Sequence, residues 1–314
     1  MQQLNSKILL FGEYALLHEG MALVIPCDLY NGRLDFYEPS NASDKKYALQ
    51  SNEYLKRFCE FVAGHTNEDF VLEVKQFEKE LQEGLFFRST IPQGYGLGSS
   101  GALVAAIFLR YLRKAKNVKD ELKYVTYQTL QELKSNLGRL ESFFHGMSSG
   151  LDPLSIVLNE PILYKNTNEI ITAKMPLRNE SDDNVVFLLD TKHPRSTSAM
   201  MERFDNLMNQ KGFKEKFGDY IIHDNNKAIE SFLNNDSDSF YTSMYDLSSF
   251  QLLEMKEFFP ESFRKDVAAG LENGDYFLKL CGAGGGGFML GFTKDWKTTQ
   301  EKLKEYTLEK IYSY

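Results

Sequence analysis

Short unbroken apolar runs alternate along this chain with apolar residues at helical spacing, which predicts strands mixed with helices. Residues 21–30 and 33–37 are predicted to pair as a hairpin, because Asn31 and Gly32 between them favour a tight turn. The other main strands are predicted at residues 7–11, 85–91, 185–190, 276–281 and 288–292. Shorter strands are expected at residues 47–49, 70–74, 154–158 and 161–164, the last two joined by a turn at Asn159 and Glu160.

Helices are predicted where apolar side chains recur every three or four positions. The helix that begins at Ser100 is apolar nearly all round in its first two turns, so it should be buried. The predicted helices are residues 53–62, 100–114, 120–144, 198–210, 220–233, 240–259 and 263–271. Helices and strands together predict an α+β architecture.

A break in the pattern suggests two domains. Residues 179–184 read NESDDN and contain no apolar side chain, unlike the segments on either side. The chain of 314 residues is long enough for two ordinary domains, which we expect at residues 1–180 and 181–314.

Charge and cysteine content exclude several functional classes. Lys and Arg number 36 against 44 Asp and Glu, so the net charge of -8 opposes binding to nucleic acid or an anionic membrane surface. The apolar runs are too short for a membrane span or a signal peptide core. Three widely spaced cysteines indicate neither disulfides nor a zinc site. A cytoplasmic protein is expected.

A glycine-rich loop precedes the buried helix. Gly94, Gly96 and Gly98 are followed by the adjacent hydroxyls of Ser99 and Ser100. Free amides and the helix dipole meet at such a helix start, where they bind phosphate. The pattern is neither the Gly-Lys-Ser/Thr loop nor the dinucleotide fingerprint. A plain loop capped by Ser99 is the alternative.

Three charged residues could carry chemistry. Lys7 heads an apolar strand, Glu141 borders the apolar face of a long helix, and Asp152 stands directly before Pro153. A carboxylate beside a buried stripe needs a partner such as a metal or a base. Each also has an ordinary explanation: a surface lysine, a solvated edge glutamate and an Asp-Pro turn.

Three glycine-bearing segments stand in a fixed order: KILLFGEYALLHEG from Lys7, IPQGYGLGSSGALVAA from Ile91 and KLCGAGGGGFMLGF from Lys279. This set resembles the three motifs of the GHMP small-molecule kinases. The resemblance implies a two-lobed fold, with an N-terminal ribosomal-S5-like α/β domain, a C-terminal ferredoxin-like α/β domain and the active site between them. It also implies ATP and Mg²⁺ as cofactors.

The resemblance assigns roles to individual residues. Asp152 resembles the catalytic aspartate and Lys7 the lysine that faces it, while Ser100 and Glu141 resemble the ligands of Mg²⁺. The phosphate loop that would wrap ATP comprises Gly94, Gly96, Leu97, Gly98, Ser99, Ser100 and Gly101. The resemblance assigns the structural support of that loop to Gly282, Gly284 and Gly285.

The acceptor is expected to be mevalonate, a small carboxylate. HGMSSGLD and TKHPRST resemble the mevalonate kinase forms of these segments, whereas GEY and Gly101 are closer to phosphomevalonate kinases. If phosphomevalonate is the acceptor, Arg195 is the basic residue to test as its phosphate clamp. Sugar or homoserine kinases and a non-catalytic ligand-binding protein are the remaining alternatives, and a homodimer is the assembly considered. The substrate-binding residues expected are Glu13, Tyr14, His18, Ser149 and Thr197.

Overall fold

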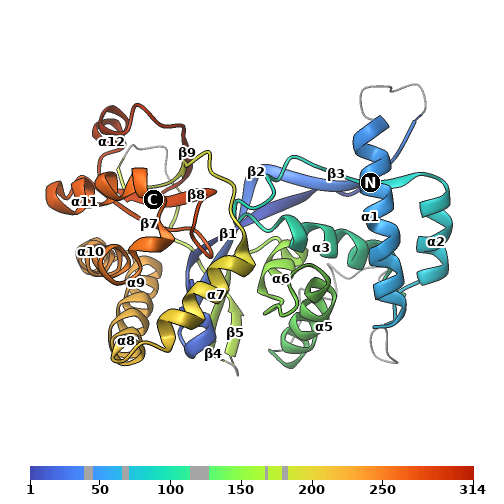
Figure 1. Cartoon of the computed structure of the whole chain (residues 1–314), viewed down its shortest axis with the longest axis horizontal. Helices are drawn as coiled ribbons and strands as arrows, with labels where there is room; N and C mark the ends of the chain where they lie inside the picture. Colours follow the sequence, from blue (N-terminus) through green and yellow to red (C-terminus); the bar gives the residue numbers. More distant parts are fainter. Residues whose placement is uncertain (39–44, 66–70, 114–126, 167–168, 179–182) are drawn as a thin grey trace. The chain divides into compact units, whose positions relative to one another are not determined.

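The structure, a computed structural model, describes residues 1–38, 45–65, 71–113, 127–166, 169–178 and 183–314. The chain forms two compact units (Figure 1). Unit 1 comprises Met1–Lys7, Pro26–Pro92 and Gly98–Glu160. Unit 2 comprises Ile8–Ile25, Gln93–Leu97 and Pro161–Tyr314. The first predicted motif and the glycine-rich loop therefore each contribute residues to both units.

Five strands near the N-terminal half form one sheet. Its order is β1-β2-β4-β5, and β3 pairs with β2 outside this path. The second half of β2 pairs with β3 from Gly32 to Phe36, and its first half pairs with β4 from Ala22 to Val24. The strands are β1 (Leu4–Phe11), β2 (Ala22–Phe36), β3 (Leu85–Ser89), β4 (Ile162–Asn166) and β5 (Glu169–Thr172).

The predicted hairpin at Asn31 and Gly32 is wrong, because β2 runs unbroken through both residues. Gly32 lies opposite Ser89 in the ladder with β3. A Cβ atom at this position would lie 2.3 Å from Cζ of Phe87, so the glycine leaves room for that ring. Gly32 thus marks a close contact with an aromatic ring of the neighbouring strand and not a turn.

The helices of unit 1 correct three predicted strands. Residues 47–49 lie in one helix and residues 154–158 in another. Of the strand predicted at residues 70–74, Leu72 makes only an isolated β-bridge with Leu112, and Val74 begins a helix. Residues 70 and 114–126 of the predicted elements lie outside the described residues. The helices are α1 (Lys45–Ala63), α2 (Val74–Gln82), α3 (Ser99–Tyr111), α5 (Tyr127–His145) and α6 (Leu151–Leu158).

The residues at the two ends of α6 explain why residues 154–158 were predicted to be a strand. Pro153 is in the first turn of the helix, where the missing N–H costs no hydrogen bond, so the Asp-Pro pair starts a helix here and not a turn. Asn159 ends the helix in the left-handed conformation, with φ of 53°, which replaces the predicted hairpin turn. α6 packs against α3 and α5 (Figure 1), and α3 is buried along most of its length as predicted.

Unit 2 contains an antiparallel sheet in the order β7-β8-β6-β9. β6 coincides with the predicted strand 185–190, and β7 and β8 confirm the strands predicted on either side of the third glycine segment. β9 was not predicted, because charged residues interrupt its apolar pattern at the sheet edge. The strands are β6 (Val185–Asp190), β7 (Tyr276–Leu280), β8 (Phe288–Thr293) and β9 (Leu308–Ser313).

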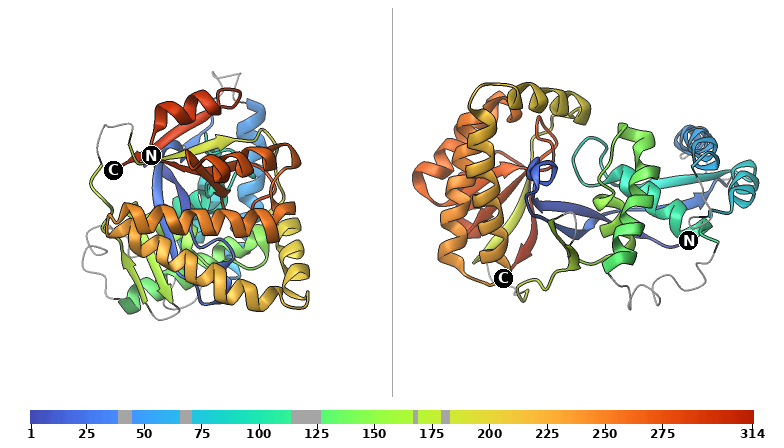
Figure 2. Two further views of the ribbon diagram at one scale, coloured as in Figure 1. Left: turned by 90° about the vertical axis from the view of Figure 1, so that its left-hand side faces the viewer. Right: turned by 90° about the horizontal axis from the view of Figure 1, so that it is seen from below.

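Helices cover this sheet and bury its apolar residues. α9 and α10 lie side by side (Figures 1 and 2), and α10 and α11 both contact β7. Phe187, Leu189 and Leu278 are in the resulting core. The helical elements are η1 (Ala15–His18), α7 (Thr197–Met208), α8 (Phe213–Lys216), η4 (Phe217–Ile222), α9 (His223–Leu233), α10 (Ser237–Glu254), η5 (Lys256–Phe258), η6 (Glu261–Phe263), α11 (Arg264–Asn273) and α12 (Trp296–Lys302).

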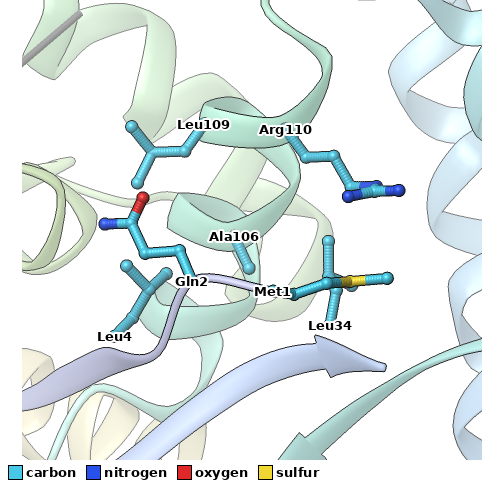
Figure 3. Close-up of a pocket in the computed structure, with 7 residues that line it drawn as sticks. All are labelled: Met1, Gln2, Leu4, Leu34, Ala106, Leu109 and Arg110. Atoms are coloured by element: carbon cyan, nitrogen blue, oxygen red, sulfur yellow. The ribbon is translucent and has the colours of Figure 1, made fainter. Parts of the chain in front are cut away.

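A pocket of about 300 Å³ lies in unit 1 beside the C-terminal half of α3 (Figure 3). Its lining is mainly apolar, and Arg110, one of its two polar residues, is ion-paired with Glu80. None of the residues singled out from the sequence lines it. Within the described parts of the chain, every helix is too short or too polar to cross a membrane.

Candidate active site

In unit 1 the glycine-rich loop leads into the N-terminus of α3. Gly98 is the N-cap residue, with φ of 76°, and it has no side chain that could cap the helix. The first hydrogen bond of the helix runs from the amide of Ala102 to the carbonyl of Gly98, so the preceding amides have no partner within the helix. A Cβ atom at Gly98 would lie 2.9 Å from Cγ of Lys7, so glycine also lets that side chain pass.

Lys7 and Asp152 form an ion pair in unit 1, as predicted from the motifs. The Nζ atom of Lys7 lies 2.7 Å from Oδ2 of Asp152. The Lys7 side chain is only 5% exposed, whereas that of Asp152 is 33% exposed, so the carboxylate can still meet a ligand from solvent. Asp152 stands in the first turn of α6, where the helix dipole favours its negative charge.

Glu141 binds two serine hydroxyls inside the same unit. Ser100 donates a hydrogen bond to Oε1 at 2.9 Å, and Ser148 donates to Oε2 at 2.5 Å. The amide of Gly150 in turn donates to the Ser148 hydroxyl at 3.0 Å. The carboxylate therefore joins α5 to the first turn of α3 and to the loop before α6.

Burial raises the pKa of the Glu141 carboxyl to about 7, and the nearby negative charge of Asp152 acts in the same direction. The two serine hydrogen bonds and the Lys7 ammonium oppose this shift. A carboxylate that is 4% exposed and lies close to another carboxylate is costly to keep ionised without a cation. A divalent cation at this position would supply the missing charge.

The protein donors here suit a magnesium ion whose remaining ligands are phosphate oxygens and water. Within the described residues there is no group of three or more His, Cys, Asp or Glu side chains that could hold a metal ion. Glu141 and Ser100 offer one carboxylate and one hydroxyl, both hard oxygen donors. Mg²⁺ typically binds through one or two carboxylates plus phosphate oxygens and water, so these residues fit that ion.

The remaining predicted residues of the glycine-rich loop belong to unit 2. Gly94, Gly96 and Leu97 lie in the segment Gln93–Leu97, which is grouped with the loop that carries Gly282, Gly284 and Gly285. The amide of Gly285 donates to the carbonyl of Phe258 at 2.6 Å, which ties that loop to the helical layer.

Glu13 is buried in unit 2 and contacts Lys279. The Nζ atom of Lys279 donates to Oε1 of Glu13 at 2.5 Å and to the carbonyls of Leu10 and Leu280 at 3.1 and 2.8 Å. The Lys279 side chain is fully buried and that of Glu13 is 3% exposed. Burial raises the pKa of the Glu13 carboxyl, and the Lys279 charge opposes that rise.

The other predicted substrate-binding residues have ordinary local contacts. The Ser149 hydroxyl accepts from the amide of Leu151 at 3.2 Å, and Thr197 is the first residue of α7. The His18 ring packs against Phe204 and Phe217, and burial lowers its pKa. Contact of these residues with a substrate stays a prediction.

Sequence interpretation missed two residues of these clusters. Ser148 stands in the segment HGMSSGLD without an assigned role, although it is the second hydroxyl on Glu141. Lys279 was noted only as the start of a glycine motif. Its signal is a lysine inside a strand whose every residue is buried, which requires a buried counter-ion.

Part of unit 1, including the helix start at α3, is similar to a known protein family. Residues 54–159 match the family model described as the GHMP kinases N terminal domain. This span includes Ser100, Glu141 and Asp152. No curated protein matches the sequence.

Solved structures with the same fold cover nearly the whole chain. L. major mevalonate kinase in complex with R-mevalonate has a TM-score of 0.65 at 15% identity, covering 100% of this chain and 96% of its own. Streptococcus pneumoniae phosphomevalonate kinase in complex with phosphomevalonate and AMPPNP has a TM-score of 0.62 at 16% identity, covering 99% of both chains. Lactococcus lactis galactokinase complexed with galactose has a TM-score of 0.68 at 15% identity, covering 99% and 93%. The predicted α+β fold is confirmed: the chain shares the fold of these kinases, and its residues 54–159 match the model of the GHMP kinases N terminal domain.

Proposed function

We propose that this protein transfers the γ-phosphoryl group of ATP to a hydroxyl group of a small molecule, and that the molecule is mevalonate. The observation that carries the proposal is the 2.7 Å contact between Lys7 and Asp152 beside the start of α3. A Cβ atom at Gly101 would lie 3.2 Å from the Cβ of Asp152, so the carboxylate packs directly on the first turn of that helix. A base and a phosphate-binding helix start are thus neighbours.

The site residues of unit 1 have distinct parts in the proposed reaction. Asp152 accepts a hydrogen bond from the acceptor hydroxyl and orients or deprotonates it. Lys7 holds the Asp152 carboxylate in place and steadies negative charge that develops on the acceptor oxygen. The amides at the N-terminus of α3, together with its dipole, hold the phosphate groups of ATP.

Ser100 and Glu141 would hold Mg²⁺, which neutralises phosphate charge when bound. Both oxygens that would face the ion are already within 2.9 Å of one another across the α3–α5 contact. Ser148 holds the second oxygen of Glu141 and so fixes the orientation of the carboxylate.

Glu141→Gln is expected to raise the Mg²⁺ concentration for half-maximal activity. Loss of an outer-shell partner weakens metal binding about 10–100-fold, so loss of a direct ligand should shift this concentration by at least about tenfold. The measurement is turnover against Mg²⁺ at saturating ATP. Glu73→Gln, at an exposed ion pair in the same unit, is the control. An unchanged Mg²⁺ dependence would refute the assignment of Glu141 as a ligand.

The choice of acceptor rests on the sequence motifs and on the solved structures of the same fold. HGMSSGLD and TKHPRST favour mevalonate, and a mevalonate kinase bound to R-mevalonate is among the similar structures. Phosphomevalonate is the second candidate, because GEY and Gly101 favour it and a phosphomevalonate kinase is equally well covered.

The test is ADP release with ATP and Mg²⁺, comparing mevalonate, phosphomevalonate, galactose and homoserine at equal concentration. Turnover on mevalonate alone is expected. Turnover on phosphomevalonate, galactose or homoserine alone would keep the phosphotransfer and change the acceptor. Binding of an acceptor without any ADP release would replace the enzyme by a ligand-binding protein.

A further inference from the structure

Glu13 and Tyr14 were expected to contact the substrate, but within unit 2 both residues hold the glycine loop of residues 281–287. The Oε1 atom of Glu13 accepts from Lys279, which lies in β7 two positions before this loop. The backbone amide of Gly282 also donates to the Glu13 carboxylate. The carboxylate thus binds the first glycine of the loop and the strand that leads into it.

Tyr14 holds the next residue of the same loop. Its hydroxyl donates to the carbonyl of Ala283 at 2.7 Å. Its ring stacks on Phe204 with centroids 4.1 Å apart and meets Phe258 edge-on at 5.5 Å. Tyr14 is only 6% exposed, and its backbone has a positive φ of 59°, which a bulky residue adopts only where its surroundings enforce it. The side chain is committed to this one position.

Arg195 holds the loop from a third side. Its Nη1 atom donates to the carbonyls of Cys281 at 2.9 Å and Gly284 at 3.2 Å. These two carbonyls flank the residues that Glu13 and Tyr14 bind. A Cβ atom at Gly96 would lie 2.6 Å from Nη2 of the same guanidinium. Arg195 therefore fills the space between the loop of residues 281–287 and the segment Gln93–Leu97.

An aromatic contact joins these two glycine-bearing segments as well. The rings of Tyr95 and Phe288 meet edge-on with centroids 5.1 Å apart. A displacement of residues 281–287 would therefore also shift Gly94 and Gly96. The resemblance to the GHMP kinases assigns both residues to the loop that would wrap the ATP phosphates.

We infer that Tyr14 and Arg195 are positioning residues for nucleotide binding, which act by fixing residues 281–287 and through them the segment Gln93–Leu97. The inference rests on the proposed function, since it presumes that the glycine-rich loop binds ATP. Tyr14 in the GEY segment therefore contributes to nucleotide binding and does not distinguish mevalonate from phosphomevalonate as the acceptor.

The test is Tyr14→Phe, which keeps the ring stacking and removes only the hydrogen bond to Ala283. One neutral hydrogen bond corresponds to a loss of affinity of about three- to tenfold. We expect the Kd of Mg²⁺-AMPPNP, measured by calorimetry, and the KM for ATP to rise by this factor, with the KM for the acceptor unchanged. Tyr245→Phe, at an exposed tyrosine of the same unit, is the matched control and should change none of them.

Arg195→Lys provides a second variant, since it keeps the positive charge but cannot bridge Cys281 and Gly284 in the same way. It should weaken AMPPNP binding as well. A rise in the acceptor KM with unchanged AMPPNP affinity in Tyr14→Phe would overturn the inference and make Tyr14 a substrate contact. Unchanged AMPPNP affinity in both variants would overturn it too. If the wild-type protein itself bound no AMPPNP, the proposed function would fail first, and the inference with it.

Discussion

Asp152→Asn is expected to lower turnover by about 10²–10⁴-fold, the range over which a positioned general acid or base contributes. The amide keeps the shape of the side chain but cannot take a proton from the acceptor hydroxyl. It also leaves the buried Lys7 ammonium without its negative partner at 2.7 Å. Affinity for Mg²⁺-AMPPNP should stay within about threefold, because one partly buried carboxylate contributes little to a phosphate site held by backbone amides.

The chain offers a matched control for this substitution. Asp35 is also in unit 1, its side chain is 32% exposed, and its Oδ2 atom lies 2.9 Å from Nε of Arg88. Asp35→Asn therefore removes a similar charge from a similar ion pair and should leave turnover unchanged. Wild-type turnover in Asp152→Asn, or an equal loss in the two variants, would contradict the catalytic assignment.

The sequence predicted elements best where pattern and length agree. Residues 185–189 form a short, continuous apolar run and, together with Asp190, are the strand β6. The run at residues 154–158 looks similar but is the second half of α6, because a short buried segment carries no periodicity that separates strand from helix. Pro153 before it fits a helix start as well as a turn. Only packing against α3 and α5 decides between them.

The charged clusters of unit 1 could be anticipated from motifs, because each partner stands in a recognisable segment. The Lys7–Asp152 pair and the Ser100–Glu141 contact both join residues that the resemblance had assigned to one site. Their roles stay proposals, but their proximity is observed.

The Lys279–Glu13 pair could not be anticipated in this way. Its partners are 266 positions apart, and no local pattern connects a strand lysine with a particular distant carboxylate. For the same reason the sequence interpretation read Tyr14 as a sign of the acceptor. The hydrogen bond of Tyr14 to Ala283, 269 positions away, offers an explanation that depends on the fold alone.

Lys279→Met is expected to lower the free energy of unfolding by about 3–5 kcal/mol, the usual effect of removing one partner from a buried ion pair. The substitution leaves the Glu13 carboxylate buried without its counter-ion, and the carbonyls of Leu10 and Leu280 lose a donor. Urea unfolding followed by tryptophan fluorescence is suited to the measurement. The single tryptophan, Trp296, is 6% exposed in the core of unit 2 and packs against Phe187.

A second substitution separates the charge from the packing. In the Lys279→Met background, Glu13→Gln removes the uncompensated charge but keeps an acceptor for Gly282, so it should restore most of the lost stability. Lys304→Met, which breaks the exposed ion pair with Glu301 in the same unit, is the control and should leave the urea midpoint unchanged. If Lys279→Met lowered the free energy of unfolding by less than about 1 kcal/mol, Glu13 would be protonated in the folded protein, since a neutral hydrogen bond contributes about that much. Lys279 would then be a hydrogen-bond donor to Glu13, Leu10 and Leu280 and not the counter-ion of Glu13.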